Sequence, residues 1–381
     1  MKKILFVAST LSHIENFHIP YLKYFKEKGF EVHILGTPNN KSQIEYADKI
    51  YPITFEKNMF SINNFKNVFK ISKIIKLENY DIISLHTTLA SFFARLGMLI
   101  SLHKSKLVIN TVHGYLFDDN TSFIKRLIFI LCEKIVKPVT NTIIVMNSAD
   151  YCIAEKYKLY KDDLYIINGM GVNTSKFPAT NSENKCTLRE KFNFSKNDFI
   201  LVYIAEFSKR KNQKFLIKSL AALINEGFSD IKLLLIGDGK LFDEVVSYSK
   251  ELNVYNNIIF TGYTKNTCSY YQLSDLCVSS SRIEGLPFNV IEAMSTGLPV
   301  VASDIKGHND LVKNNYNGFL YEYDNINQFC SLIKLLSSDR KLLHDMSQNS
   351  LTVSKKYSLD SVFNNNIEIL ISEYNKSLTR K

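Results

Sequence analysis

The chain has 381 residues, of which 45% are apolar and 22% are charged, and 47 Lys and Arg against 37 Asp and Glu give a formal net charge of +10. This composition is that of a soluble globular protein and excludes disordered and collagen-like classes. The length predicts two domains of ordinary size. The positive charge favours anionic partners, which include nucleotides, phosphates, acidic lipid surfaces and nucleic acid.

The N-terminal segment MKKILFVAST carries two lysines before a short apolar run. The run is too short for the apolar region of a signal peptide, and no small-residue cleavage site follows, so we expect a first β-strand here. No apolar stretch approaches the roughly 18–20 residues that a membrane-spanning helix needs. We therefore expect no part of the chain to cross a membrane, and peripheral attachment stays open.

Short apolar runs alternate with amphipathic stretches along the first half, which predicts βα units and a parallel sheet. Helical spacing of apolar residues appears at 17–29 and at 122–137. The strands that we expect in this half lie at 2–9, 30–36, 80–87, 106–114 and 141–147.

A polar interval at 176–198 interrupts this pattern, and a second strand series follows it. The strands of this series are expected at 199–205, 231–237, 257–263, 276–281 and 298–303. The C-terminal segment has a Ser or Asp cap and apolar residues near helical spacing, which predicts a long closing helix. We therefore predict an α/β protein with domains at 1–178 and 179–357 and a closing helix at 358–381.

The six cysteines form no C-x-x-C pair and have no histidine at the spacing of a zinc site. We expect reduced, mostly buried thiols of a cytosolic protein at Cys132, Cys152, Cys186, Cys268, Cys277 and Cys330.

Ligands of open α/β sheets bind outside the carboxyl ends of the strands, so the loops that follow strands are the places to look for chemistry. In the first half, NTVHGYLFDD places His113 and Gly114 just past an apolar strand. A histidine there can hydrogen-bond a ligand, act as an acid or base, or satisfy a backbone group.

In the second half, a strand is expected to end at Ala205 and a helix to begin near Asn212. Three cations, Lys209, Arg210 and Lys211, lie between them, and cations beside a helix start suit a diphosphate. A solvated basic turn is the alternative. The later LIGDGK also follows a strand, but it lacks the third glycine of a dinucleotide fingerprint.

The stretch RIEGLPFNVIEAM holds two carboxylates, Glu284 and Glu292. Pro287 fits a first helical turn, so the helix is expected to begin near Pro287 and Phe288, which leaves Glu284 in a loop and Glu292 in the helix. Even in one continuous helix the two would lie about 12 Å apart, at roughly 1.5 Å per residue. We therefore expect contacts to different parts of one long ligand, unless both are ordinary surface residues.

Backbone N–H groups between the two glutamates lie at or near this helix start, where the unpaired donors and the helix dipole favour phosphate. The residues concerned are Gly285, Leu286, Phe288 and Asn289.

These motifs, in this order, resemble the family 4 retaining glycosyltransferases of the GT-B fold over nearly the whole chain. The most specific is E-x7-E at Glu284 and Glu292, and IGDG, FTGY, TVHG and GMGVNTSKF support it. The opening segment and HGYLF look most like the branch that builds bacterial capsule, exopolysaccharide and O-antigen chains. The resemblance implies two Rossmann-like domains facing each other across a cleft, with the C-terminal helix closing back on the N-terminal domain.

The resemblance also implies roles for four residues: Glu284 lies by the donor sugar, Glu292 accepts hydrogen bonds from the nucleotide ribose, Lys211 neutralises the leaving diphosphate, and His113 reaches the sugar. Such fixed cations stabilise a leaving UDP in the transition state. No metal and no other cofactor is then expected.

The chain departs from the family pattern at Glu206, where many members carry a phosphate-binding arginine, and Lys209 or Arg210 is the expected replacement. The glycine pair common in the family's first loop is also absent. Asp118 and Asp119 do not form the D-x-D pattern of metal-using transferases.

The substrates implied by the resemblance are a UDP-N-acetylhexosamine or UDP-hexose donor and a saccharide on undecaprenyl diphosphate. Such an enzyme is cytoplasmic and peripheral at the inner face of the bacterial cell membrane. Segment 122–137, with Lys125, Arg126, Lys134 and Lys137, could rest on an anionic membrane or pack as an ordinary amphipathic helix.

Two other functions stay open at this point. A UDP-sugar epimerase of the same fold would need no acceptor, and a non-catalytic nucleotide-binding protein would need no chemistry. Nucleic acid is not expected, because the chain has no RNA-binding motif and no stripe of interleaved aromatic and basic residues.

Overall fold

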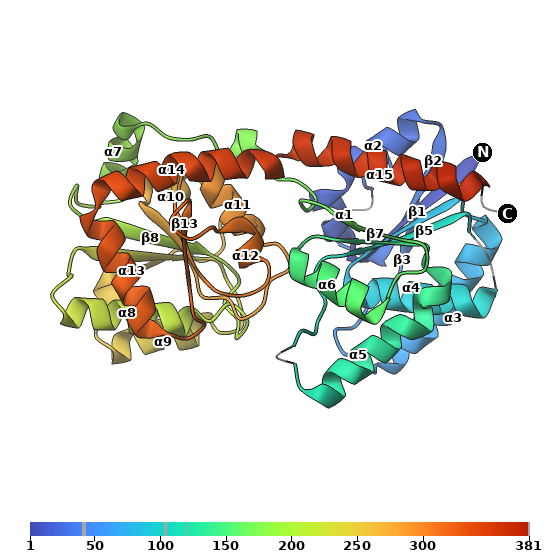
Figure 1. Cartoon of the computed structure of the whole chain (residues 1–381), viewed down its shortest axis with the longest axis horizontal. Helices are drawn as coiled ribbons and strands as arrows, with labels where there is room; N and C mark the ends of the chain where they lie inside the picture. Colours follow the sequence, from blue (N-terminus) through green and yellow to red (C-terminus); the bar gives the residue numbers. More distant parts are fainter. Residues whose placement is uncertain (40–42, 103–104, 120, 380–381) are drawn as a thin grey trace. The chain divides into compact units, whose positions relative to one another are not determined.

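The computed structural model describes residues 1–39, 43–102, 105–119 and 121–379. The chain folds into two compact units (Figure 1). The N-terminal unit is Met1–Gly171 with Asp360–Lys381, and the C-terminal unit is Val172–Leu359. The unit boundaries therefore lie at 171/172 and 359/360, where we expected 178/179 and 357/358. Val172 and Ser358 form a parallel bridge. The two segments in which the chain passes from one unit to the other therefore lie side by side.

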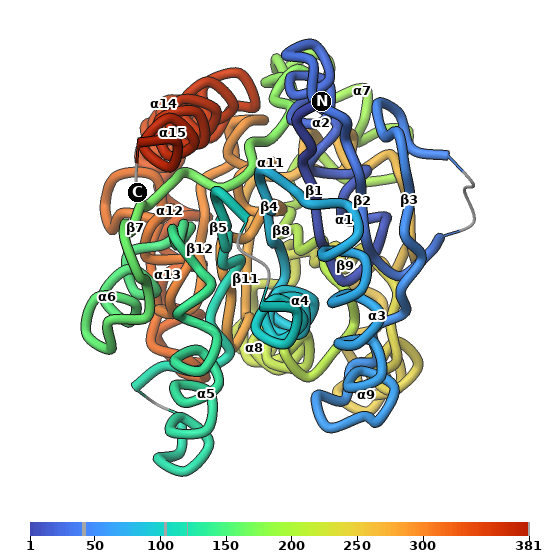
Figure 2. The backbone as a smooth tube through the Cα atoms, turned by 90° about the vertical axis from the view of Figure 1, so that its right-hand side faces the viewer, coloured from blue at the N-terminus to red at the C-terminus, as the bar shows by residue number. Residues whose placement is uncertain are grey.

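The N-terminal unit is built on a seven-stranded sheet in the order β3-β2-β1-β4-β5-β6-β7, with every neighbouring pair parallel. The strand order reverses between β1 and β4. Figure 2 shows this spatial order, with β3 at one edge of the sheet and β7 at the other. Their bounds are β1 Lys2–Thr10, β2 Phe30–Thr37, β3 Lys49–Pro52, β4 Ile82–His86, β5 Leu107–Val112, β6 Thr142–Val145 and β7 Asp163–Ile166.

Helices cover both faces of this sheet, which is why its central strands are continuous apolar runs rather than alternating ones. In both views α2 and α15 lie on one face and α3, α4 and α5 on the other (Figure 1 and Figure 2). The helices are α1 Leu11–Phe17, α2 Ile19–Glu27, α3 Ile62–Glu78, α4 Thr88–Ser101, α5 Phe123–Val136, α6 Ser148–Tyr157 and α15 Leu359–Thr379, with a 3-10 turn at Lys137–Val139.

The C-terminal helix α15 is held on the N-terminal unit by buried polar contacts. Asn366 Nδ2 donates to Tyr21 Oη at 2.9 Å, and Glu373 accepts from Thr142 Oγ1 at 2.6 Å and from Tyr165 Oη at 2.9 Å. The expectation that this helix closes back on the N-terminal domain is confirmed.

The C-terminal unit has a six-stranded parallel sheet in the order β10-β9-β8-β11-β12-β13. Here the order reverses between β8 and β11. The strands are β8 Phe199–Ile204, β9 Ile231–Ile236, β10 Ile258–Phe260, β11 Leu276–Ser279, β12 Val300–Ser303 and β13 Gly318–Tyr321.

In this unit α8 and α9 lie on one face of the sheet and α10 and α11 on the other (Figure 1). The helices are α7 Ser182–Lys191, α8 Gln213–Asn225, α9 Phe242–Glu251, α10 Cys268–Leu273, α11 Phe288–Ser295, α12 His308–Leu311, α13 Ile326–Ser338 and α14 Arg340–Ser354, with 3-10 turns at Thr174–Lys176, Tyr255–Asn257 and Lys355–Tyr357.

All ten strands expected from the sequence are present, whereas β3, β7 and β13 were not expected. Each of the three is a sheet edge of four residues, and an edge strand needs less apolar sequence than a central one.

The polar interval at 176–198 is a folded part of the C-terminal unit. It contains α7, where Arg189 donates to the Asp275 carboxylate at 2.6 Å and Lys185 donates to the same group at 2.9 Å. A charged, largely exposed helix is therefore fastened to the sheet by its cations rather than by an apolar face.

The expectation of mostly buried thiols is wrong. All six cysteines are free, but only Cys277 and Cys330 are buried, while Cys152 and Cys186 are exposed. Within the described residues, no helix combines the length and the apolar character needed to span a membrane.

Candidate active site

The two loops singled out in the second half of the sequence meet at the carboxyl ends of β8 and β11. These strands are neighbours, and the strand order of the sheet reverses between them. Such a reversal leaves a crevice at the strand ends, which is where open α/β sheets bind ligands.

Hydrogen bonds from buried side chains fasten the basic loop to the loop that carries Glu284. Ser280 Oγ donates to the carbonyl oxygens of Lys211 and Asn212, both at 3.0 Å. The Tyr203 hydroxyl lies 2.8 Å from Ser281 Oγ and 3.2 Å from the Lys211 carbonyl oxygen. The position of Lys211 is thus fixed by the end of β11.

Glu284 is only 8% exposed and is ion-paired on both carboxylate oxygens. Lys211 Nζ donates to Oε1 at 2.5 Å, and Arg210 Nη1 donates to Oε2 at 2.8 Å. Burial alone would raise the pKa of Glu284, but Lys211 and Arg210 outweigh it and hold the pKa below its ordinary value. Glu284 is therefore ionised at neutral pH, with both oxygens engaged.

The structure brings Glu284, Lys211 and Arg210 together, and Arg210 is 43% exposed. Lys209 is exposed too, but it is not among the described ion-pair partners of Glu284. Of the two candidates to replace the family's phosphate-binding arginine, Arg210 is the one beside the glutamate. Glu206 occupies the family position itself and is exposed.

Three glycines shape this crevice, and the sequence reasoning gave them little or no weight. Gly237 and Gly239 have φ of +138° and +155°, and a Cβ on them would lie 2.2 Å from Ala205 O and 2.5 Å from Phe207 O. Gly307, with φ +84°, would likewise place a Cβ 2.6 Å from Gly285 O. Only glycine lets these backbones approach so closely. The sequence offers one signal for these residues, because each of the three glycines lies within a few residues after the end of a strand.

Helix α11 begins at Phe288, as the sequence predicts, but Pro287 occupies the N-cap position just before the first helical turn, and no side chain caps the helix. Its first-turn N–H groups are thus at the expected place, next to Gly285 and the buried Leu286. The Asn289 side chain donates to Ile204 O at 3.0 Å, which ties the helix start to the end of β8.

Glu292 lies further along α11 and differs from Glu284 in its electrostatics. Its Oε2 accepts a hydrogen bond from the Tyr271 hydroxyl at 3.1 Å. Burial raises the pKa of Glu292 to about 7, with the Tyr271 bond acting in the opposite direction. The E-x7-E motif thus supplies one carboxylate that is fixed as an anion and one that titrates near neutral pH.

In the N-terminal unit, His113 belongs to a cluster of four histidines. Its Nε2 lies 3.4 Å from His86 Nδ1, and its ring centroid lies 4.8 Å from that of His13. The fully buried His18 ring is 3.9 Å from that of His86. The sequence reasoning found only His113. The other three lie where β1 and β4 end: His13 and His18 follow β1, and His86 is the last residue of β4. The strand-order reversal lies between these two strands.

Burial lowers the pKa of all four histidines, and neighbouring imidazoles lower it further for His18, His86 and His113, so the cluster is neutral at pH 7. Neutral imidazoles both donate and accept, which suits sugar hydroxyls. Nitrogen atoms of His13, His18 and His113 lie within 4.8 Å of one another, a set that could also hold a metal ion.

Family models match both halves of the chain. Residues 184–352 match the family described as glycosyl transferases group 1, and residues 3–144 match the glycosyl transferase 4-like family. The putative glycosyltransferase EpsD of Bacillus subtilis is 31% identical, over 94% of this chain and 93% of that protein.

A second relative is the UDP-Gal:alpha-D-GlcNAc-diphosphoundecaprenol alpha-1,3-galactosyltransferase of Escherichia coli, 29% identical over 78% of this chain and 76% of that protein. Among solved structures, Anabaena HepE in complex with UDP superposes with a TM-score of 0.77, at 19% identity, over 98% of this chain and 100% of that one. The fold is GT-B and the protein is a glycosyltransferase. The chain belongs to the group 1 glycosyltransferases, the family 4 type.

If Glu284 lies by the donor sugar, as the resemblance implies, Glu284→Ala should lower sugar transfer by at least about 100-fold, because the reacting sugar loses a positioned carboxylate, while UDP affinity stays within a few-fold. It should also lower the free energy of unfolding by about 3–5 kcal/mol, since Lys211 is left buried without its partner. Transfer assays, UDP titration and denaturant unfolding measure the three effects.

Glu284→Gln keeps the side-chain shape and an oxygen that can accept from Lys211 Nζ, so it should lose transfer with a smaller loss of stability than Glu284→Ala. Glu251→Gln, an exposed change at the end of α9, is the matched control. Transfer near the wild-type rate in a folded Glu284→Ala protein would show that the assigned role is wrong.

Glu292 makes donor binding depend on pH if its carboxylate accepts from the ribose. A carboxyl with a pKa of about 7 must first lose its proton at lower pH, so affinity should fall about tenfold per unit below pH 6 and level off above pH 8. Calorimetric titration measures this affinity. The ligand is a UDP-sugar rather than UDP, because the terminal phosphate of UDP itself titrates near pH 6 and would add a pH dependence of its own. Glu292→Gln should abolish the slope, and an unchanged slope contradicts the assignment.

Proposed function

We propose that this enzyme transfers a hexose or N-acetylhexosamine from a UDP-sugar, with retention, to a saccharide linked to a lipid diphosphate in bacterial surface polysaccharide synthesis. The observation that carries the proposal is the buried Glu284 carboxylate, paired with Lys211 and Arg210 beside the start of α11. The structure of HepE in complex with UDP supports the donor class. The name of the E. coli relative, a galactosyltransferase that acts on GlcNAc-diphosphoundecaprenol, supports the acceptor class.

In the proposed reaction the donor diphosphate binds at the α11 start, with Arg210 and Lys211 as its cations. The bond between the anomeric carbon and the diphosphate oxygen breaks while an acceptor hydroxyl attacks from the same face. The departing phosphate takes the hydroxyl proton. Negative charge develops on the leaving UDP, which preorganised cations and amides stabilise.

Other residues of the site position the donor. Glu292 would accept from the ribose hydroxyls, and Glu284 would hold the sugar and support positive charge at the anomeric carbon. Neutral His113 would hydrogen-bond the sugar. Because fixed cations carry the charge of the leaving group, the transfer itself would need no metal ion.

A panel of UDP-sugars offered with a short lipid-diphosphate saccharide, followed by the mass of the product, tests this function. We expect one donor to yield a product one sugar heavier, with UDP released only when the acceptor is present and unchanged rates after EDTA treatment. Conversion of the donor without acceptor would instead indicate an epimerase. Loss of transfer in EDTA, restored by one divalent metal, would contradict the metal-free mechanism and direct attention to the histidine cluster.

We also propose that α5 rests on an anionic membrane surface. The helix buries Ile130, Glu133 and Val136, whereas Phe123 and Ile124 are 70% and 73% exposed. Further exposed apolar side chains on it are Leu127, Leu131 and Ile135, and its cations are Lys125, Arg126 and Lys134. An exposed apolar face beside cations suits the headgroup region of an acidic bilayer.

Sedimentation with liposomes of increasing phosphatidylglycerol content measures this contact. The bound fraction should rise with anionic lipid and fall several-fold when Phe123 and Leu127 are both changed to Ser. Tyr263→Ser, an equally exposed aromatic position in the C-terminal unit, is the control. Binding that ignores both lipid charge and the α5 changes would rule the proposal out.

A further inference from the structure

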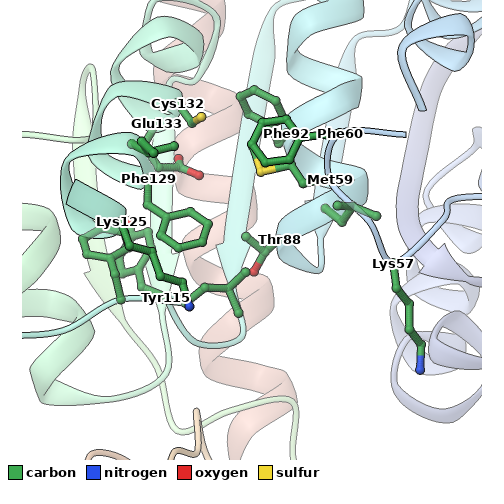
Figure 3. Close-up of a pocket in the computed structure, with 14 residues that line it drawn as sticks. Lys57, Met59, Phe60, Thr88, Phe92, Tyr115, Lys125, Phe129, Cys132 and Glu133 are labelled. Atoms are coloured by element: carbon green, nitrogen blue, oxygen red, sulfur yellow. The ribbon is translucent and has the colours of Figure 1, made fainter. Parts of the chain in front are cut away.

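The N-terminal unit contains a pocket of about 310 Å³ that none of the assigned roles uses. It opens between the segment before α3, the first turns of α4, the loop after His113, and α5 (Figure 3). Aromatic and aliphatic side chains form most of its lining, among them Met59, Phe60, Leu89, Phe92, Phe117 and Phe129.

Among the described lining residues the carboxylate is that of Glu133, and it is neutralised. The buried Arg95 donates to both of its oxygens, at 2.8 and 3.1 Å. Glu133 therefore brings no unpaired charge to the pocket, and the apolar walls suit the hydrocarbon part of a ligand.

Positive charge lies at the pocket edge. Lys57 and Lys125 line it and are exposed to solvent. Exposed apolar side chains, Phe60, Leu116 and Ile128, lie beside them. A hydrocarbon interior with a cationic edge is complementary to an amphiphile whose apolar chain carries an anionic head group.

The pocket is joined by a short loop to His113, which the proposed function places at the donor sugar. Tyr115, Leu116 and Phe117 line the pocket and follow His113 after one glycine, Gly114. The four residues from Gly114 to Phe117 span at most about 14 Å. A head group at the pocket edge would thus lie close to the histidine cluster.

The pocket is also continuous with the proposed membrane contact. Ile128 and Phe129 belong to α5, which also exposes Phe123, Ile124, Leu127, Leu131 and Ile135. A volume of this size takes only a short segment of a long lipid, so the remainder of the chain would stay in the bilayer under α5.

We propose that this pocket holds the head-proximal segment of the polyprenyl chain of the acceptor, with Lys57 and Lys125 facing its diphosphate. The proposal rests on the proposed function, because that function supplies a lipid-diphosphate acceptor. The occupant is an isoprenoid rather than a membrane phospholipid, since the pocket shares a loop with His113 and would serve the substrate of the reaction.

The test compares two acceptors that carry the same saccharide diphosphate, one on a geranylgeranyl chain and one on a methyl group, in buffer without lipid or detergent. The wild-type KM is expected to be at least about tenfold lower for the isoprenoid acceptor, because apolar surface leaves water. Met59→Trp adds bulk to the pocket lining and should bring the ratio of the two KM values close to one.

Leu116→Asp, at an exposed edge position, is the second variant and should act in the same direction without disturbing the core. Leu378→Trp adds the same bulk at an exposed position on α15 and should keep the wild-type ratio. Thermal unfolding confirms that each variant is folded.

A wild-type ratio near one, with both acceptors glycosylated, overturns the pocket assignment and leaves the proposed function intact. No transfer to either acceptor under any donor contradicts the proposed function itself. Competition by dihexanoyl phosphatidylglycerol as strong as that by the isoprenoid acceptor would identify a general lipid site and overturn the isoprenoid assignment.

Discussion

The C-terminal site depends on one buried charge arrangement, the Glu284 carboxylate between Lys211 and Arg210. A carboxylate that is 8% exposed is tolerated only when cations compensate its desolvation. Glu284 comes from the loop after β11 and its cations from the loop after β8, so the pairing needs these two strands to be neighbours. The pairing also needs the hydrogen bonds of Ser280, Ser281 and Tyr203, because these bonds hold the two loops together. Local features that look independent in the sequence are thus parts of one electrostatic unit.

That unit also constrains the chemistry. Both oxygens of Glu284 already accept hydrogen bonds from cations, which makes the group a poor nucleophile and a good anchor. Glu292 is the complementary case, because no cation among the described residues pairs with it and burial raises its pKa to about 7. A motif of two identical residues therefore produces two different acids, and the difference arises from tertiary neighbours rather than from the motif.

The sequence predicted the features that follow from local pattern and failed where topology decides. Ten strands, the start of α11 at Phe288 and the meeting of the two C-terminal loops follow from apolar runs, Pro287 and the parallel-sheet rule. The edge strands β3, β7 and β13 have four residues each, too few to stand out as apolar runs. His13, His18 and His86 are far apart in sequence, and only the placement of β1 beside β4 brings them to His113. Gly237, Gly239 and Gly307 matter through backbones that they approach, which no local pattern encodes.

The two units divide the chemistry by charge. The C-terminal unit offers fixed cations and an ionised carboxylate, which suit an anionic nucleotide donor. The N-terminal unit offers neutral imidazoles and an apolar pocket in which Arg95 neutralises Glu133, the carboxylate among the described lining residues. Neutral histidines can bind uncharged hydroxyls without attracting the donor diphosphate, because lowered pKa values remove the positive charge that would compete for it. Burial of the histidine cluster thereby favours the proposed division, in which the C-terminal unit holds the donor diphosphate and the neutral imidazoles bind hydroxyl groups.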